Sequence, residues 1–130
     1  LISAFNKVRN HFGVNRIAQA GALAALKDEA WLDHVLEQIT IARDRIGDIA
    51  RDNGLTALPS ATNFVAIDCG ADAGFAKRVL DGLISRGIFA RMPFAAPQNR
   101  CIRISCGPQV DLDAFAAALP AAIQSAQSAK

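Results

Sequence analysis

The feature that most constrains the fold is a stripe of apolar residues between Asp28 and Asn53. Its members recur at alternating spacings of three and four residues: Leu32, Val35, Ile39, Ala42, Ile46 and Ile49. This spacing places them on one side of an α-helix, and Gly54 follows as a residue that ends a helix in a left-handed turn. Such a helix is more than twice the average length of about 12 residues. We therefore expect it to span a domain or to bridge to a neighbouring one.

Two further helices are marked by the residues at their ends. Asn15 is an N-cap residue in front of segment 18–28, which is rich in alanine and leucine. Residues 73–86 carry apolar side chains on one face, and Gly87 follows them as a stop signal. Both segments are therefore predicted to be helical.

The two ends of the chain carry weaker signals. Residues 1–13 form an irregular approach to the first helix, which carries His11 and Phe12. Asp111 is expected to cap a last helix that Pro120 kinks. The final residues, 126–130, are rich in serine, alanine and glutamine and are expected to fray.

Three short segments are enriched in β-branched and aromatic residues, as strands are: 62–68, 88–91 and 100–106. Together with the helices they predict an α+β fold. We expect a small sheet of three or four strands with helices on one face, preceded by the long bridging helix. The other face of the sheet is left for a partner surface or a cleft.

Composition limits the class of protein. Apolar residues make up 52% of the 130 residues, enough for the core of one domain. The net charge of +2 is too small to indicate nucleic acid or an anionic membrane as the main partner. Apolar runs are short and interrupted by charges, so neither a transmembrane helix nor a signal peptide is expected. Because the chain begins at Leu1 and its only methionine is Met92, we expect a piece of a longer protein.

The cysteines indicate a cellular compartment. Cys69, Cys101 and Cys106 are odd in number, without CxxC spacing and without nearby histidines. This pattern favours reduced, mostly buried thiols over a disulfide set or a zinc site. It is typical of a cytoplasmic protein.

Two arginines occupy short apolar segments, where a guanidinium is unusual: Arg91 closes one predicted strand, and Arg103 lies in the middle of segment 100–106. Side chains alternate across a strand. The segment 100–106 therefore presents two sets to opposite faces: Ile102, Ile104 and Cys106 on one, and Cys101, Arg103 and Ser105 on the other. The isoleucines suit the helix-covered core, so Arg103 is expected on the open face.

Two guanidinium groups near one surface suit a carboxylate or a phosphate, because each offers paired N–H donors at matching geometry. An arginine on an open sheet face also commonly pairs with a protein carboxylate or lies against solvent. The residues alone favour this structural alternative for Arg91 and do not decide for Arg103. Asn63, early in segment 62–68, is a structural clasp or part of a site, and the structural role is favoured.

Other catalytic patterns are missing from the sequence. It contains no glycine-rich phosphate loop, no Ser-His-Asp arrangement and no paired carboxylates. The candidate chemistry of this chain therefore rests on the arginines.

Four motifs in register carry a family resemblance: FGVNRIAQAGALAAL (12–26), SATNF (60–64), GIFAR (87–91) and CIRISCG (101–107). They resemble the C-terminal part of histidinol-phosphate aminotransferases, which are class I/II pyridoxal-phosphate enzymes of the aspartate-aminotransferase fold. The resemblance covers essentially the whole chain. It implies a helical bridge over residues 1–54 and the small domain of such an enzyme over residues 55–125.

The resemblance also implies roles for single residues. Arg103 matches the arginine that binds the acidic group of the substrate, and Arg91 matches the one that assists in binding the substrate phosphate. Asn63 and Phe64 match residues that line or brace that side of the cleft. Two departures lie beside this pocket: Met92-Pro93 after Arg91, and Ser-Cys-Gly-Pro after Ile104. The amino donor therefore stays open among aromatic, branched and phosphorylated substrates.

The family's chemistry needs a lysine that binds the cofactor, pyridoxal 5'-phosphate, as a Schiff base. In relatives this lysine follows a serine, and none of the lysines here does: Lys7, Lys27, Lys77 and Lys130. The resemblance thus implies that this chain supplies substrate-binding groups and is inactive alone. A large domain, preceding it, would supply the cofactor, and the active sites would form in a homodimer that transfers amino groups to a 2-oxo acid in amino-acid biosynthesis.

Two other functions remain alternatives. The first is a non-catalytic α+β module that senses small anions through Arg91 and Arg103, which a coding sequence without an upstream region would favour. The second is an RNA-binding sheet, which needs aromatic residues on its open strands. Only Phe64 and Phe89 are available for that, and the near-neutral charge argues against it. A Ser-Lys followed by a glycine and an arginine in the upstream coding sequence would favour the aminotransferase.

Overall fold

The structure is a computed structural model that describes residues 1–10 and 13–129. His11, Phe12 and Lys130, which the sequence assigns to the irregular approach and the tail, lie outside the described residues. The chain divides into two compact units, Leu1–Leu36 and the residues from 37 onward. The division falls inside the long helix α3 (Glu29–Asp52).

The first unit contains α1 (Ile2–Val8), α2 (Arg16–Lys27) and the start of α3. The predicted cap of α2 is confirmed, because the Asn15 side chain accepts a hydrogen bond of 2.8 Å from the N–H of Ala18. Helix α1 corrects the expectation of an irregular approach. Its N-terminus has no side-chain cap, and neither α1 nor α2 buries a residue, so the sequence offers no signal for it.

Helix α3 confirms the long helix that the apolar stripe predicts. The buried members of the stripe are Ala42, Ile46 and Ile49, all in its C-terminal half. The chain leaves the helix through Gly54, whose φ of 71° is the left-handed conformation that glycine adopts without steric cost. Only this half of α3 therefore contributes to the core of the second unit.

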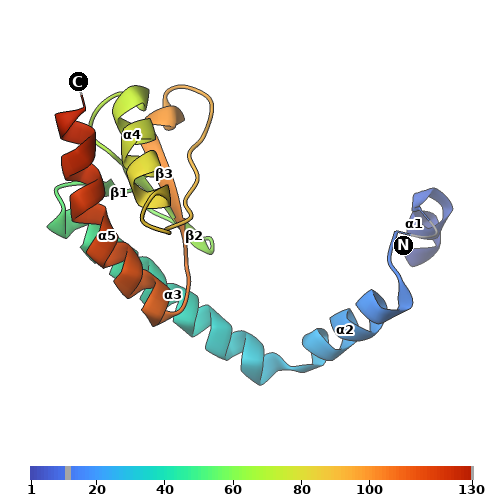
Figure 1. Ribbon diagram of the computed structural model, residues 1–130. Helices are drawn as coiled ribbons and strands as arrows, with labels where there is room; N and C mark the ends of the chain where they lie inside the picture. Colours follow the sequence, from blue (N-terminus) through green and yellow to red (C-terminus); the bar gives the residue numbers. More distant parts are fainter. Residues whose placement is uncertain (11–12, 130) are drawn as a thin grey trace. The chain divides into compact units, whose positions relative to one another are not determined.

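The sheet has three antiparallel strands in the order β1 (Thr56–Ala57), β2 (Phe64–Asp68) and β3 (Cys101–Ser105) (Figure 1). In the register of β2 and β3, Val65 faces Ile104 and Ile67 faces Ile102. These four side chains are buried on one face of the sheet. The predicted alternation of β3 is thus confirmed, with Arg103 on the opposite face.

Two strand predictions need correction. Segment 88–91 is not a strand of its own, because it meets β3 only through an isolated bridge between Arg91 and Arg103. The two-residue strand β1 was not predicted, since two residues carry no alternation that a sequence could reveal. Strand β2 also begins at Phe64, so Thr62 and Asn63 precede it.

Helices α4 (Ala73–Ile84) and α5 (Gln109–Ser128) lie side by side (Figure 1). The side chain of Asp72 caps α4 through the N–H of Phe75, at 2.8 Å. The predicted cap of α5 is wrong: the N-cap is Pro108, and Asp111 lies in the first turn of the helix.

Helix α4 ends at Ile84, two residues before the predicted end, and Gly87 follows it as the predicted stop. The chain leaves α4 through Gly87, whose φ is 80°. Helix α5 continues through Pro120 to Ser128, and Ala126 within it is buried, so the helix is longer than the sequence predicts. The short 3₁₀ helix η1 (Gln98–Arg100) leads into β3.

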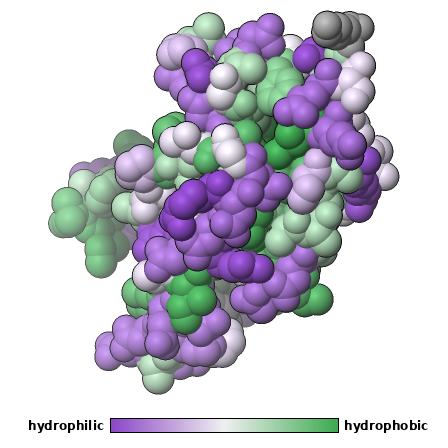
Figure 2. All heavy atoms as spheres, turned by 90° about the vertical axis from the view of Figure 1, so that its left-hand side faces the viewer, coloured by the Kyte–Doolittle hydropathy of each residue, from purple (hydrophilic) through white to green (hydrophobic). Residues whose placement is uncertain are grey.

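One hydrophobic core joins the sheet to α3, α4 and α5. Its largest fully buried side chains come from all of these elements: Phe115, Ile46, Ile67, Leu83, Ile102, Leu119 and Val79. The predicted α+β class, with a small sheet and a long preceding helix, is confirmed. On the side of α5, the outer surface is mainly hydrophilic with separate apolar groups (Figure 2). Within the described residues, no helix is long and apolar enough to cross a membrane.

Candidate anion-binding site

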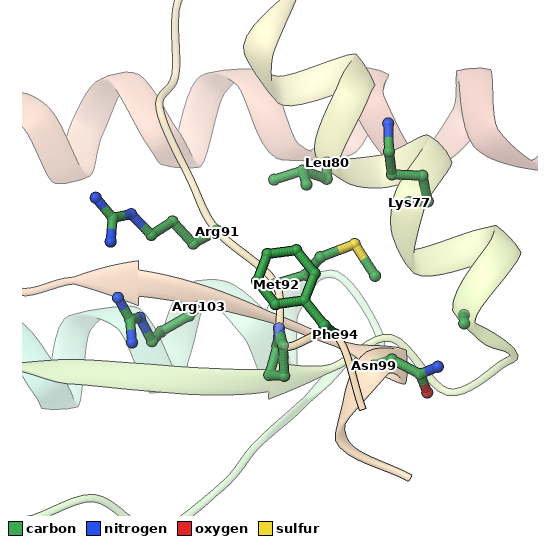
Figure 3. A pocket seen from close by; sticks show the side chains of 9 residues that line it. Lys77, Leu80, Arg91, Met92, Phe94, Asn99 and Arg103 are labelled. Carbon is green, nitrogen blue, oxygen red and sulfur yellow. The ribbon is translucent and has the colours of Figure 1, made fainter. Parts of the chain in front are cut away.

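Arg91 and Arg103 face each other across an antiparallel bridge. The N–H of Arg103 donates to the carbonyl of Arg91 at 2.6 Å, and the N–H of Arg91 donates to the carbonyl of Arg103 at 3.3 Å. Residues opposite each other in such a pair project their side chains to the same face. The two guanidinium groups accordingly lie on the same side of the strands (Figure 3).

Each guanidinium lies over an aromatic ring. The Cζ of Arg103 is 4.6 Å from the ring centroid of Phe64, and the Cζ of Arg91 is 5.6 Å from that of Phe89. Both distances are within the roughly 6 Å range of cation–π attraction. The ring contacts the flat face of the guanidinium. The N–H donors lie in the plane of the guanidinium and therefore stay available for an anion.

Carboxylates accompany three other arginines of this unit, Arg45, Arg51 and Arg100, and none within the described residues accompanies Arg91 or Arg103. Arg100 pairs with Asp68 at 2.8 Å, and Arg51 with Asp48 at 2.9 Å. Among the residues that the structure describes, neither Arg91 nor Arg103 has a carboxylate oxygen within 4.0 Å. Like charges placed opposite each other on a sheet repel, and an anion bound between them would remove that repulsion.

A turn rich in hydroxyl groups holds Phe64 at the entrance of β2. The hydroxyls of Ser60 and Thr62 donate to the carbonyl of Phe64, at 2.6 and 3.2 Å. The N–H of Phe64 in turn donates to the Thr62 hydroxyl at 3.4 Å. These local bonds fix the backbone from which the Phe64 ring reaches Arg103.

Asn63 lies at the edge of this arrangement. Its backbone carbonyl accepts a hydrogen bond of 2.8 Å from the N–H of Cys106, and its side chain is exposed. The argument that a buried amide must be bonded therefore does not apply to it. The structure brings Arg91 and Arg103 together in one pocket, whose lining does not include Asn63.

The pocket has a volume of about 750 Å³ and lies between α4, segment 91–94 and β3 (Figure 3). Its lining combines the two arginines with mostly apolar groups: Ala73, Lys77, Leu80, Met92, Pro93, Phe94 and Asn99. The two arginines are thus on one side, and Leu80, Met92 and Phe94 form an apolar side (Figure 3). Such a pocket suits a molecule with an anionic end and an apolar body.

The ammonium group of Lys77 in this pocket already has a partner. It donates to both carboxylate oxygens of Asp81, one turn further along α4. Lys77 is therefore held in an ion pair on the surface of α4.

Asp68 is the last residue of strand β2, at the end opposite Phe64. A hydrogen bond from the N–H of Gly70 holds its pKa below the usual value of 3.8; burial opposes this shift, and the Arg100 guanidinium reinforces it. Asp68 and Arg100 tie β2 to the start of β3. This ion pair is structural, since neither residue lines the pocket.

The cysteines are free thiols, and Cys69 and Cys101 are buried, as the sequence predicts. Burial raises the pKa of Cys69 to about 11 and raises those of Cys101 and Cys106 as well. A thiol with a raised pKa is a poor nucleophile at neutral pH. In the described part of the chain, no group of three or more histidine, cysteine or acidic residues is placed to hold a metal ion.

Comparison with known proteins decides the family. The sequence profile of "Aminotransferase class I and II" matches residues 1–119. The chain belongs to the class I and II aminotransferase family. The similarity also confirms the predicted relation to histidinol-phosphate aminotransferases at the level of the family and of the fold.

Curated relatives include histidinol-phosphate aminotransferases from two bacteria. The chain is 35% identical over 120 residues to the one from Geobacter sulfurreducens, covering 92% of this chain and 33% of the relative. It is 32% identical over 123 residues to the one from Granulibacter bethesdensis, covering 93% and 32%. The chain therefore spans about a third of the length of the curated relatives it matches.

A solved structure shows the same fold. The histidinol-phosphate aminotransferase of Sinorhizobium meliloti, in complex with pyridoxal-5'-phosphate, is 57% identical and superimposes with a TM-score of 0.89. The match covers 94% of this chain and 33% of that one. The α+β unit is thus the small domain of the aminotransferase fold, as the resemblance implies.

Sequence reasoning missed the ring of Phe89 and the apolar side of the pocket. The position of Phe89, two residues before Arg91 in an extended segment, places both side chains on the same side and is a signal that the sequence does contain. Leu80 and Met92 come together only through the packing of α4 against segment 91–94, for which a single sequence offers no pattern.

Proposed function

We propose that this chain is the C-terminal part of a pyridoxal-phosphate-dependent aminotransferase. The enzyme would move an amino group between a 2-oxo acid and an amino acid or an amino phosphate that resembles histidinol phosphate. Family membership and the names of the relatives support this assignment. The observation that carries it is the pair Arg91 and Arg103, side by side on one face and without a carboxylate partner in the described residues.

In this proposal Arg103 is the principal anchor of the substrate's anionic group, and Arg91 assists it. Arg103 is half-buried and lies closer to its aromatic ring, whereas Arg91 is exposed. Water weakens the attraction between a guanidinium and an anion. The less exposed guanidinium of Arg103 is screened less and therefore binds an anion more strongly. Asn63 directly precedes β2, next to Phe64, and we assign it a bracing role at the rim of the site.

None of the lysines Lys7, Lys27 and Lys77 follows a serine, as the cofactor-binding lysine does in the family that the chain resembles. The cofactor needs an amine that can form a Schiff base, and Lys77, the lysine in the pocket, is bound to Asp81. We therefore place cofactor binding in the part of the protein outside this chain. The chain alone is expected to have no aminotransferase activity.

The surface of the first unit suits a contact with the part of the protein outside this chain. Its apolar side chains are strongly exposed, among them Ile17 at 85%, Leu26 at 79% and Trp31 at 62%. Groups of apolar side chains on a surface mark contacts with other protein. We propose that residues 1–54 bridge to a large domain and that residues 55–125 act as the small domain of a cytoplasmic homodimer.

The proposed function is tested by replacing Arg103 with alanine in the full-length protein. Histidinol phosphate serves as amino donor and 2-oxoglutarate as acceptor. Loss of a charge-assisted hydrogen-bond pair should raise KM about 10- to 150-fold, from roughly 1.5–3 kcal/mol, and the visible absorbance of the bound cofactor should persist. Loss of the cofactor with unchanged substrate affinity would contradict the assigned role.

A matched variant, Arg51→Ala, removes an arginine whose ion pair with Asp48 is exposed on α3. It should leave KM unchanged. Anion binding that depends on Arg103 in a full-length protein without any transaminase activity would instead support a non-catalytic anion-binding module.

A further inference from the structure

Phe89 is an exposed aromatic side chain beside the anion-binding arginines. It is 78% exposed, so packing against this chain does not explain a ring at that position. It lies two residues before Arg91 in the extended segment that meets β3, and the Arg91 guanidinium lies over its ring, 5.6 Å from Cζ to centroid. The contact is therefore a cation–π contact between the Phe89 ring and the Arg91 guanidinium.

The same arrangement occurs a second time in the site. Arg103 lies 4.6 Å from the ring centroid of Phe64, and Phe64 is in register with Ser105, two residues beyond Arg103 on β3. Two guanidinium groups on one face are thus each placed over a ring. Within the part of the chain that the structure describes, neither pair has a carboxylate that would compete with an incoming anion.

We propose that Phe89 is a positioning residue for Arg91, and the proposal rests on the anion-binding function assigned above. The arginine side chain is long and loses much rotamer freedom when its guanidinium is fixed by a ligand. The Phe89 ring fixes the exposed guanidinium before the ligand arrives, so that less freedom remains to be lost on binding. The ring contacts the face of the guanidinium, so the in-plane N–H donors of Arg91 stay available for a ligand.

This arrangement has a consequence for substrate choice. A carboxylate fills one guanidinium fork, and the half-buried Arg103 is sufficient for it. A phosphate offers three oxygens and uses a second guanidinium as well. Phe89 therefore favours amino donors that carry a phosphate over donors that carry only carboxylates.

The test uses the full-length protein with pyridoxal phosphate bound and the variant Phe89→Leu, which removes the ring and keeps an apolar side chain. A cation–π contact at an exposed site corresponds to about a two- to fivefold change in affinity. We expect KM for histidinol phosphate and the calorimetric Kd of inorganic phosphate to rise by this factor. The kcat of Phe89→Leu should stay unchanged. The midpoint of its urea unfolding should also stay unchanged, because the side chain is exposed. Phe89→Tyr keeps the ring and should therefore show the wild-type KM and Kd.

Two further variants separate the possible outcomes. Phe75→Leu removes a ring that contacts a guanidinium elsewhere, since Arg78 lies 5.8 Å from the Phe75 centroid on α4, and it should leave both binding constants unchanged. Arg91→Ala should weaken phosphate binding more than Phe89→Leu does. If Arg91→Ala weakens phosphate binding and Phe89→Leu does not, the positioning role is refuted. If Arg91→Ala has no effect either, the proposed function of Arg91 fails as well.

Discussion

Two glycines inside helices test how closely α4 packs against α5. Gly82 lies near the end of α4, and a methyl group added there would be 3.1 Å from both Cα and Cβ of Ala122 on α5. Gly47 lies within α3, and a methyl group there would meet nothing within 4 Å. Both are helical positions, but only one has space, so Gly47→Ala is a matched control for Gly82→Ala.

The expected difference follows from two opposing effects. Alanine in place of glycine in a helix interior stabilises by about 1 kcal/mol, which Gly47→Ala should show in full. At Gly82 the new carbon lies well inside the optimal carbon–carbon separation of about 3.5–4.0 Å, and overpacking of this kind costs about 1–3 kcal/mol. Gly82→Ala should therefore change the free energy of unfolding by between about zero and 2 kcal/mol, in the destabilising direction.

Urea unfolding of both variants, followed by circular dichroism at 222 nm, measures the two free energies. The difference between the variants should be about 1–3 kcal/mol in favour of Gly47→Ala. Equal stabilisation by the two substitutions would refute the close contact between α4 and α5. Since Leu80 and Lys77 of α4 line the pocket, that result would also question the position of the pocket wall.

Two further predictions concern titratable groups. The folded-state pKa of Asp68 is lowered, so its contribution to stability is complete above its usual pKa and is lost as the pH falls below about 4. The wild type should therefore lose more unfolding free energy than Asp68→Asn in urea titrations between pH 6 and 3, and parallel losses would contradict this. In labelling with Ellman's reagent at pH 7.5, the half-buried Cys106 should react before the buried Cys69 and Cys101, which should react only after denaturation. Fast labelling of Cys69 would contradict its burial.

Strong local patterns predicted the larger elements of the fold. The stripe of α3 and the cap Asn15 are determined by neighbouring residues, and the structure contains them. The alternation in β3 also predicted that Arg103 lies opposite the buried Ile102 and Ile104. These features follow from periodicity, which a single sequence carries in full.

Elements without such a pattern were missed or misplaced. Helix α1 buries nothing, and β1 is two residues long. Segment 88–91 has the composition of a strand, but only Arg91 has its N–H and carbonyl opposite those of Arg103. Composition indicates that a segment favours an extended backbone, whereas the number of ladder bonds depends on where the neighbouring strand runs.

The candidate site was predicted in part. The apolar segments that contain them mark both arginines, and the resemblance ranks Arg103 above Arg91. Their direct opposition depends on the pairing of two segments that are joined by a loop with two prolines, and no local signal determines that register. The contact between Phe64 and Arg103 likewise requires the register of β2 with β3.

The central claim is that Arg91 and Arg103 bind the same anionic group. A double-mutant cycle in the full-length protein tests it most directly, with Arg91→Ala, Arg103→Ala and the double variant, and with KM for histidinol phosphate as the measured quantity. Two residues that hold one group should show a coupling energy of about 0.5–3 kcal/mol. Effects that add to within about 0.5 kcal/mol would mean that the two arginines act on separate groups, and would contradict the claim.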